Sequence, residues 1–550
     1  MDFDAVLIEP RREAMARAGH WRGKTINDYF DAVMAEKPDA LALSSISVTE
    51  GVRRDLTWAE LDRAANRAAV GLSRLGVGPG DVVTCQLPNN WKFVATYLAC
   101  SRLGAVFNPV MPIFRERELL FMLNHGEARV FIVPQVFRNF DHEAMAEGMR
   151  AELPHLQHII VAGRDGTNSF TRMLANPDFD DEPDLKRLVI ENRPGPDDVN
   201  QLIYTSGTTG EPKGVMHTSN TMFSNLIPYS ERLGLTSDDV IAMASPMAHQ
   251  TGFMYGLLMP IYLRARSILF DAWDRRLKAF TVRDDRVTFT MASTPFLMDL
   301  TQAVEENRVD SSSLRIFLCA GAAIPGPVVE RARQVMTGTK VISAWGMTEN
   351  GAVTLVDPRD DDERSVNTDG FPLPGVELQI RDDAGNVAPL NTPGELFVRC
   401  CSNFGGYLKR PHLNATDEDG WFDTGDVARM DERGYIRIAG RSKDIIIRGA
   451  ENIPVFEVES VLFKHPAIQQ AAIVAYPDER LGERACAFVT LKPGASFDMD
   501  EMKRHLGAHR LAIQYWPERL EIREALPATA SGKIQKFALR KMLREEMGLA

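Results

Sequence analysis

Short apolar runs alternate with helix-type patterns from residue 57 to residue 343 of this 550-residue chain. Thr57 and Glu60 have the spacing of a capping box, and the apolar residues after them recur at helical spacing until Gly76. The apolar runs 82–87 and 105–110 predict strands, with a helix at 91–103 between them. This order joins parallel strands. We therefore predict an α/β fold with a large N-terminal domain of parallel and mixed sheets flanked by helices.

The sequence pattern changes in the last third of the chain. From about Val376, short strands and turns predict a β-rich subdomain. The residues beyond Arg441 have their own helix and strand pattern, which predicts a small α+β domain. We place the boundary in the charged segment 441–444. The predicted domains are residues 1–441 and residues 442–550.

A loop rich in hydroxyl groups and glycine follows the apolar residues 202–204. Residues 204–215 read Tyr-Thr-Ser-Gly-Thr-Thr-Gly-Glu-Pro-Lys-Gly-Val. Glycine permits close backbone approach, hydroxyls donate without adding charge, and a lysine offsets the charge of an anion. A solvated linker would not require Pro-Lys-Gly directly before an apolar strand, and the spacing is not that of the kinase and GTPase P-loop. The predicted phosphate-binding residues are Thr205, Ser206, Gly207, Thr208, Thr209, Gly210 and Lys213.

Composition limits the class of protein. The net charge of −12 argues against a general nucleic-acid binder, whereas a local cationic cluster can still bind a small anion. The six cysteines form no Cys-x-x-Cys pair and no Cys/His ligand spacing, which predicts reduced thiols and no structural zinc. No signal peptide is recognisable, and the longest apolar run, 252–263, is shorter than the roughly 17 residues of a spanning helix. We expect a soluble cytoplasmic enzyme without an integral membrane segment.

The loop and several later strings resemble the adenylate-forming superfamily, which comprises acyl-CoA synthetases, the adenylation domains of peptide synthetases, and luciferase. The resemblance covers nearly the whole chain, with its motifs in the family's order. The other matching strings are 246–253, 319–325, 344–351, 421–426, 440–444, 449–459 and 526–534. This resemblance implies ATP, Mg²⁺ and CoA as cofactors and a small carboxylate as the substrate.

The resemblance also implies a role for individual residues at the nucleotide. Glu349 supplies an oxygen ligand for Mg²⁺, and Thr348 donates to a phosphate. Lys533 bridges the carboxylate and the α-phosphate, where it stabilises developing charge. The nucleotide-binding residues implied are Gly321, Ala322 and Ala323 along adenine, Trp345 stacked on it, Asp426 at the ribose hydroxyls, and Arg441.

Further residues fall on the acyl and CoA sides of the site. The resemblance places His249, Phe253, Gly346 and Met347 at the acyl group, although a single histidine is more often packed or at the surface. Acetate-specific relatives carry tryptophan at position 346, so the glycine implies room for a longer or cyclic acid. Lys443 corresponds to the hinge. The CoA-side residues implied are Gly449, Ala450, Glu451 and Asn452. The chain departs from the family pattern at two positions: Ala450 stands where relatives usually have a glycine, and Ala528 stands where they often have a basic residue.

The implied reaction has two halves: a carboxylate and Mg·ATP give acyl-AMP and pyrophosphate, and then the CoA thiol displaces AMP. The small domain would rotate about Lys443 between them. The strings 344–351 and 451–455 look most like those of cyclohexanecarboxylate-CoA ligases, with medium-chain fatty-acid ligases as the alternative. A carrier-protein-loading enzyme, a non-catalytic nucleotide- or acyl-binding protein and a luciferase-like oxidase remain as rivals. The oligomeric state stays open, with a homodimer as one option.

Overall fold

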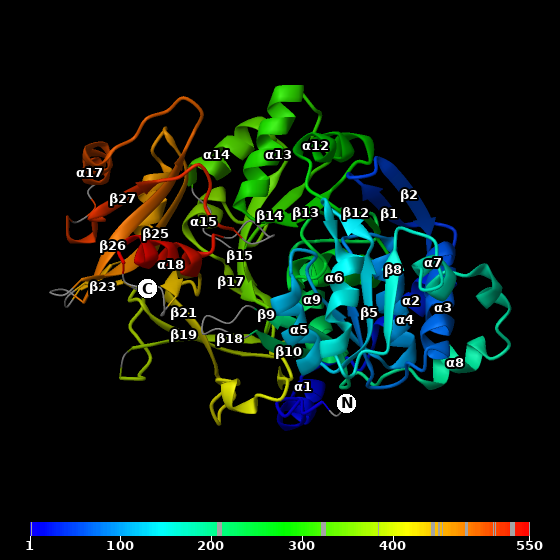
Figure 1. Cartoon of the computed structure of the whole chain (residues 1–550). Helices are drawn as coiled ribbons and strands as arrows, with labels where there is room; N and C mark the ends of the chain where they lie inside the picture. The colour runs from blue at the N-terminus through cyan, green and yellow to red at the C-terminus, as the bar shows by residue number, and fades with distance from the viewer. Residues whose placement is uncertain are drawn as a thin grey trace.

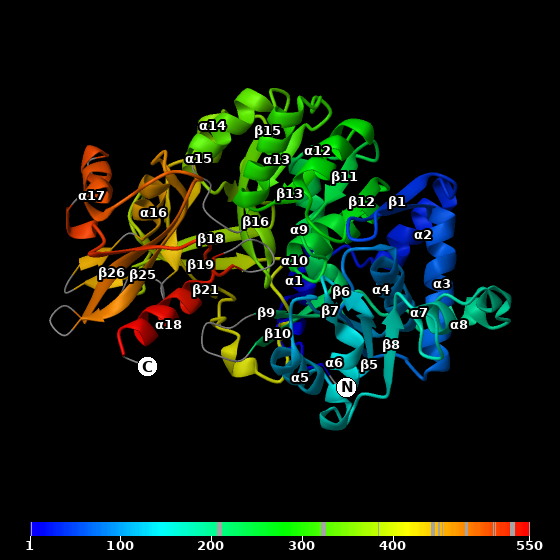
Figure 2. The ribbon, with the colours of Figure 1, turned by 45° about the horizontal axis from the view of Figure 1, so that its top comes forward.

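The computed structural model describes residues 1, 3–205, 212–320, 326–382, 384–441, 446–448, 451–453, 455–478, 482–509, 511, 513–528 and 534–548. Figures 1 and 2 show the C-terminal elements gathered at one side of the molecule, away from α3 and α8. The helices of the described part are α1 (Arg12–Arg17), α2 (Ile26–Glu36), α3 (Trp58–Arg74), α4 (Trp91–Leu103), α5 (Glu116–His125), α6 (His142–Met149), α7 (Phe170–Leu174), α8 (Leu185–Glu191), α9 (Ser219–Arg232), α10 (Gln250–Gly252), a π-helix (Phe253–Leu258), α11 (Met259–Leu263), α12 (Arg275–Asp284), α13 (Thr294–Asn307), α14 (Gly326–Val335), α15 (Asp362–Asn367), α16 (Val455–Phe463), α17 (Met499–Ala508) and α18 (Lys536–Glu546).

A seven-stranded sheet carries the two strands beside the phosphate loop. Its order is β20 (Gly406–Tyr407), β10 (Lys213–Thr218), β9 (Val199–Thr205), β4 (Val106–Pro109), β3 (Val82–Cys85), β5 (Ala128–Pro134) and β8 (His158–Ala162). The strands from β9 to β8 run parallel, whereas β10 pairs antiparallel with both β9 and β20. The βαβ pattern therefore predicts the parallel part correctly, and the antiparallel edge lies at the loop.

A nine-stranded sheet forms the second large layer. Its order is β17 (Phe371–Pro372), β16 (Gly351–Leu355), β15 (Lys340–Met347), β14 (Ile316–Cys319), β13 (Phe289–Ala292), β11 (Val240–Met243), β12 (Arg266–Phe270), β1 (Leu41–Ser47) and β2 (Val52–Thr57). The central strands are parallel, and both ends are antiparallel. One hydrophobic core contains residues of both large sheets and of α3, α4 and α9. The N-terminal part is thus the predicted mixed α/β arrangement.

Two smaller sheets follow in the last third of the chain. The first, in the predicted β-rich region, has the order β18 (Val376–Arg381), β19 (Gly394–Cys400), β21 (Phe422–Met430) and β22 (Ile436–Arg441). The second joins β24 (Glu451–Ile453), β23 (Ile446–Arg448), β26 (Gly482–Leu491) and β25 (Ile468–Asp478), with β27 (Arg519–Ile522) beside β26. A short hairpin of β6 (Val136–Phe137) and β7 (Phe140–Asp141) completes the described strands. The guanidinium of Arg437 in β22 lies 4.8 Å from the ring centre of Phe456 in α16, so the two sheet regions are in contact.

Local capping explains where several helices begin and end. The capping box of Thr57 and Glu60 is formed at the start of α3, as predicted. The side chain of Asn90 accepts from the backbone N–H of Phe93 at the start of α4, and Gly104 ends that helix at φ 65°. All six cysteines are buried and have free thiols.

Lys278 in α12 is a charged residue inside the core. Its side chain is buried, and its Nζ has no hydrogen-bond partner in the described part of the chain. The centre of the Phe270 ring lies 4.6 Å from Nζ. Desolvation by burial lowers the pKa of Lys278 to about 7, because the charged form loses its hydration.

Replacing Lys278 with methionine is expected to stabilise the protein at neutral pH. Between pH 7 and the ordinary lysine value of 10.5, the unfolded chain holds this proton and the folded chain does not, so stability rises with pH across that window. The variant should therefore gain on the order of 4 kcal/mol at pH 7, and the gain should shrink toward pH 10. Urea unfolding of both proteins at pH 7 and pH 9.5 measures this. An equal gain at both pH values would show that the buried charge is not responsible.

Candidate active site

The strands on either side of the phosphate loop are paired up to the loop itself. Thr205, the last residue of β9, lies opposite Lys213, the first residue of β10. The two flanking residues of the predicted phosphate site are therefore cross-strand neighbours. The remaining predicted residues of the loop, Ser206, Gly207, Thr208, Thr209 and Gly210, lie outside the described residues.

Lys213 and Glu349 both contact one aromatic side chain, Tyr407. Val215 lies opposite Tyr407 in the β10–β20 pair, and Lys213, two residues from Val215, is on the same face of the strand. Its Nζ lies 4.5 Å from the centre of the Tyr407 ring. The Tyr407 hydroxyl donates to Oε1 of Glu349 at 2.6 Å. Tyr407 thus contacts both the lysine predicted to bind phosphate and the carboxylate predicted to bind the metal. The sequence alone did not predict a role for Tyr407, and the only feature that marks it there is an aromatic residue directly after Gly405-Gly406.

A buried histidine ties β10 to the segment of Thr348. His217 Nε2 lies 2.8 Å from the backbone oxygen of Thr348, and its Nδ1 lies 3.1 Å from Oγ1 of Thr221. Desolvation by burial lowers the pKa of His217 to about 4, so the ring is neutral at pH 7. The neutral ring donates from Nε2 to the carbonyl, and Nδ1 accepts from the threonine hydroxyl. The strand after the phosphate loop therefore holds the backbone that precedes Glu349.

Trp345 and Asp426 are joined by a buried hydrogen bond. The indole N–H of Trp345 donates to Oδ2 of Asp426 at 2.9 Å. Asp426 lies opposite Arg441 in the β21–β22 pair, so the two residues predicted at the nucleotide are cross-strand neighbours; only the backbone of Arg441 is described. Trp345 also belongs to the hydrophobic core of the β-rich sheet. Its stacking on adenine and the ribose contacts of Asp426 stay predictions.

Comparison with known proteins assigns this arrangement to a family. Residues 30–408 match the family model described as AMP-binding enzyme, and residues 457–533 match the model described as AMP-binding enzyme C-terminal domain. The first match alone spans more than half of the chain. The chain belongs to the AMP-binding enzyme family.

Individual relatives of this AMP-binding enzyme agree over nearly the full length. It is similar to the medium-chain fatty-acid–CoA ligase of Escherichia coli (strain K12), with 38% identity over 98% of this chain and 94% of the relative. The salicylyl-CoA synthase / salicylate adenylyltransferase of Streptomyces sp is 32% identical, over 96% and 95% of the two chains. The crystal structure of the anthranilate CoA ligase AuaEII in complex with anthranoyl-AMP aligns with a TM-score of 0.84 at 26% identity, covering 96% of this chain and 98% of that one. The AMP-binding enzyme is thus an ATP-dependent ligase that works through an acyl-AMP, with ATP, Mg²⁺ and CoA as its cofactors.

The residues around Glu349 fit a magnesium ion that arrives with ATP. Glu349 is buried, and within the described part of the chain its only side-chain hydrogen bond is the one from Tyr407 to Oε1. No group of three or more His, Cys, Asp or Glu residues among the described residues could hold a metal. Mg²⁺ characteristically takes one or two carboxylates and completes its shell with phosphate oxygens and water. A single buried carboxylate beside a phosphate loop therefore suits Mg·ATP better than a permanently held metal.

The glycine at position 346 has a packing reason in this AMP-binding enzyme. Gly346 lies opposite Ala352 in the β15–β16 pair. A Cβ added at Gly346 would collide with the backbone oxygen of Gly351 and with Cα of Ala352. A side chain here would thus require the hairpin to move, whatever the size of the acyl pocket. The roles of Gly346 and of its partly buried neighbour Met347 at the acyl group stay predictions.

The two other predicted acyl-site residues lie at the start of a buried helical segment. His249 caps α10, where its Nδ1 accepts from the backbone N–H of Thr251 at 3.3 Å. Phe253 begins the π-helix and is fully buried. Its ring centre lies 4.9 Å from that of Tyr97 and 6.2 Å from that of Phe107. Phe253 is therefore a core residue in this structure, and its contact with the acyl group also stays a prediction.

The predicted residues on the C-terminal side are largely beyond what the structure describes. Those outside the described residues are Gly321, Ala322, Ala323, Lys443, Gly449, Ala450 and Lys533. The backbones of Glu451 and Asn452 belong to β24, opposite Arg448 and Ile447. An antiparallel bridge joins Ala528 to Ile534, which brings together the two ends of the segment that contains Lys533.

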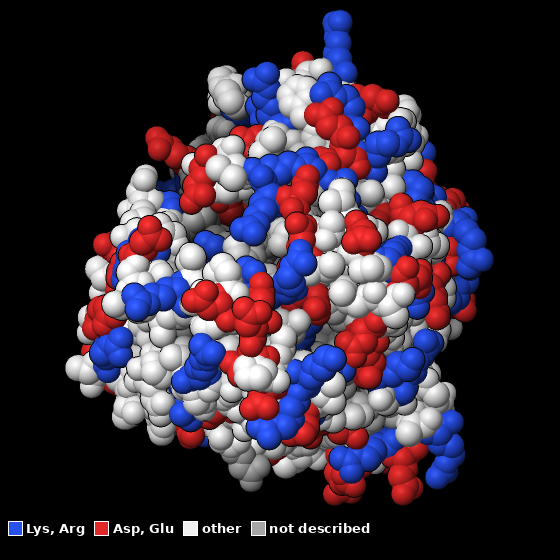
Figure 3. Space-filling view, turned by 90° about the vertical axis from the view of Figure 1, so that its right-hand side faces the viewer, with Lys and Arg blue, Asp and Glu red and all other residues white. Residues whose placement is uncertain are grey.

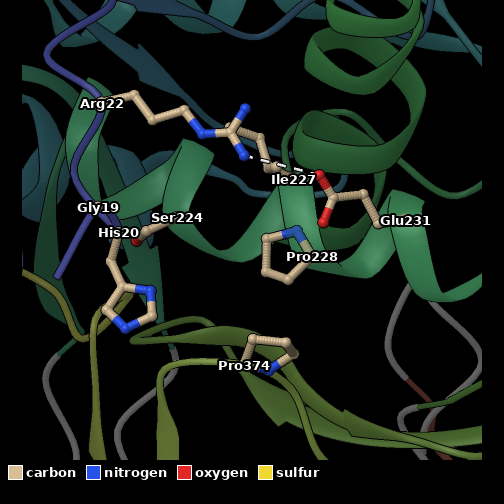
Figure 4. Close-up of a pocket in the computed structure, with 8 residues that line it drawn as sticks. All are labelled: Gly19, His20, Arg22, Ser224, Ile227, Pro228, Glu231 and Pro374. Atoms are coloured by element: carbon tan, nitrogen blue, oxygen red, sulfur yellow. Dashed lines mark ion pairs between the residues drawn. The ribbon is translucent and has the colours of Figure 1, made fainter.

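A surface hollow beside α9 does not contain any of the predicted site residues. Figure 4 shows the ion pair that crosses it, between Arg22 and Glu231 at 3.6 Å. It has a volume of about 90 Å³ and adjoins a more open hollow of about 490 Å³. Its lining is Gly19, His20, Arg22, Ser224, Ile227, Pro228, Glu231 and Pro374. We do not assign this hollow to the reaction, because Lys213, Glu349 and Asp426 are not among its lining residues.

Two surface properties bear on partners of the AMP-binding enzyme. On the face in Figure 3, acidic and basic side chains are interspersed without a large area of one sign. Among the described helices, none combines the length and the apolar character needed to cross a lipid bilayer.

Proposed function

We propose that this AMP-binding enzyme is a carboxylate–CoA ligase whose preferred acid is alicyclic, such as cyclohexanecarboxylate. The observation that carries the ligase chemistry is the meeting of Lys213, Tyr407 and Glu349, together with the hydrogen bond from Trp345 of β15 to Asp426 of β21. The preference for a ring is supported by the similarity to the salicylate and anthranilate enzymes.

In the first half-reaction, a carboxylate oxygen attacks the α-phosphorus of ATP and the bond from this phosphorus to pyrophosphate breaks, while side chains of this enzyme stabilise the negative charge. Lys213 and the hydroxyls of the loop bind phosphate oxygens, and Asp426 accepts from the ribose hydroxyls. In this proposal the role of Lys533 is to bridge the carboxylate and the α-phosphate and to stabilise the charge that develops there. Glu349 would hold Mg²⁺, which when bound neutralises negative charge on the phosphates. A carboxylate becomes a good electrophile in this way because AMP is a good leaving group.

In the second half-reaction the thiol of CoA displaces AMP from the same carbonyl. We propose that residues 442–550 rotate about Lys443 between the two steps, because one site must first enclose phosphates and later admit the thiol. Gly449, Ala450, Glu451 and Asn452 would then line the approach of CoA. The contact of Arg437 with Phe456 would be broken or remade by this rotation.

A medium-chain fatty acid is the second candidate substrate. It is favoured by one observation, the 38% identity with the Escherichia coli medium-chain fatty-acid–CoA ligase over almost the whole chain. The buried wall around Phe253 and Tyr97 suits any hydrocarbon group, so it does not discriminate between a ring and a chain.

A panel of carboxylates tests this proposal. We expect CoA-dependent AMP formation with cyclohexanecarboxylate at a kcat/KM at least about tenfold above that with acetate, because burial of each additional CH₂ contributes about 0.8 kcal/mol. The same measurement with octanoate tests a medium-chain fatty acid as the substrate, and that with benzoate tests an aromatic acid. A higher kcat/KM for octanoate than for cyclohexanecarboxylate would show that the preferred substrate is a medium-chain fatty acid and not an alicyclic acid. AMP formation that requires a carrier protein in place of CoA would overturn both.

A further inference from the structure

Tyr407 contacts two charged residues of the proposed adenylation site with two different parts of one side chain. Its hydroxyl donates to Oε1 of Glu349 at 2.6 Å, and its ring face lies under the ammonium of Lys213, 4.5 Å from the ring centre. The side chain is buried. A hydrogen bond from a hydroxyl to a carboxylate is among the stronger ones, and a cation over an aromatic face is attracted by the ring's quadrupole.

The backbone that carries Tyr407 is fixed against the segment of Glu349. The N–H of Phe404 donates to the backbone oxygen of Glu349 at 2.8 Å, and the hydroxyl of Ser402 donates to that of Asn350 at 2.8 Å. From the other side, the guanidinium of Arg11 donates to the carbonyls of Cys400, Asn403 and Phe404. Asn414 Oδ1 accepts from the N–H of Tyr407 itself at 2.9 Å. The backbone of Tyr407 is therefore held in place by contacts other than those of its side chain with Glu349 and Lys213.

We propose that Tyr407 is a positioning residue for adenylation. Its hydroxyl occupies Oε1 of Glu349 and leaves Oε2 as the carboxylate oxygen for Mg²⁺, while its ring supports Lys213 beside the phosphate loop. This inference rests on the proposed function, since it gives Glu349 and Lys213 the roles stated there. It adds a residue that couples the metal ligand to the phosphate lysine.

The contributions of the hydroxyl and of the ring of Tyr407 can be measured separately with two variants. Tyr407→Phe keeps the ring under Lys213 and removes only the hydroxyl, so the carboxylate of Glu349 loses its fixed orientation. Tyr407→Leu removes both contacts. The partners that orient a metal ligand typically contribute about 10- to 100-fold to metal affinity or activity, which sets the expected size of the effect.

The first measurement is pyrophosphate release as a function of Mg²⁺ concentration. For Tyr407→Phe we expect an apparent Mg²⁺ constant raised about tenfold or more. The thioester step, started from synthetic acyl-AMP without Mg²⁺, should keep its rate, because neither Glu349 nor the metal takes part in it. For Tyr407→Leu we expect an additional loss of ATP affinity at saturating Mg²⁺. Equal losses in both half-reactions of Tyr407→Phe would mean a general structural role and would overturn the proposal.

A calorimetric binding measurement provides a readout that does not depend on turnover. Tyr407→Phe should weaken binding of Mg·ATP and leave binding of AMP, measured without metal, unchanged. If the wild-type protein releases no pyrophosphate with any acid, the proposed function fails while this measurement still decides the role of Tyr407. Identical Mg·ATP binding by the wild-type protein and Tyr407→Phe would contradict the positioning role of Tyr407 and leave the proposed function unaffected.

Tyr435→Phe is the matched control. The hydroxyl of Tyr435 also donates to a carboxylate, that of Asp360, and the guanidinium of Arg364 lies 4.5 Å from its ring centre. None of its described side-chain contacts is with a residue proposed for the site. The control should keep the wild-type Mg²⁺ dependence. A shift in Tyr435→Phe equal to that in Tyr407→Phe would show that loss of any buried tyrosine–carboxylate bond has this effect, which would overturn the proposal.

Discussion

Replacing Lys533 with alanine is expected to lower the rate of acyl-AMP formation about 10²- to 10³-fold, because a charge-stabilising donor is lost where negative charge develops. The thioester step from synthetic acyl-AMP should keep most of its rate, since the carboxylate has by then already been joined to AMP. Pyrophosphate release reports the first step, and CoA consumption from added acyl-AMP reports the second.

Lys536→Ala is the control for this variant. Lys536 is three residues away in the sequence, but its Nζ forms an ion pair with Glu459 at 2.7 Å within the C-terminal region. We expect adenylation by this variant to be close to that of the wild-type protein. If Lys533→Ala slowed both half-reactions by the same factor, the assignment of Lys533 to the first step alone would be wrong.

Replacing Glu349 with glutamine is expected to have an effect of similar size, about 10²-fold or more on adenylation at ordinary Mg²⁺ concentrations. Glutamine keeps the size of the side chain, and its oxygen can still accept from Tyr407, but the negative charge for the metal is gone. The loss should therefore become smaller as Mg²⁺ is raised, as seen in pyrophosphate release.

The contrast with Lys533→Ala makes this second prediction specific. Additional Mg²⁺ should restore part of the activity of Glu349→Gln and none of that of Lys533→Ala. A Mg²⁺ dependence of Glu349→Gln identical to that of the wild-type protein would remove Glu349 from the metal site, whatever the loss in rate.

The sequence predicts elements best where their ends carry explicit chemical signals. Helix α4 has the predicted bounds, because Asn90 caps its start and Gly104 adopts a positive φ at its end. Strand β15 extends to Met347, whereas the alternating pattern in the sequence ends at residue 343. The extra residues pair with β16 across a register shift at Trp345 and Gly346, and no periodic pattern reveals such a pairing.

The candidate site divides in the same way. Lys213, Glu349 and Asp426 are predicted from their motifs, and the structure brings Lys213 and Glu349 to one side chain, that of Tyr407. Tyr407 was not found, because it belongs to a two-residue strand whose partner β10 is far away in the sequence. The burial of Lys278 could not be predicted from the sequence either, because the sequence of α12 does not tell which of its charged residues faces the sheet.

The close contact at Gly346 limits how this enzyme could be adapted to other acids. A Cβ at that position meets the main chain of the opposite strand, so randomising residue 346 would mostly yield displaced hairpins rather than new selectivities. Under the proposed function, efforts to broaden or narrow the range of accepted acids would begin instead with the side chains around the π-helix Phe253–Leu258, because volume-conserving exchanges between packed side chains are tolerated best.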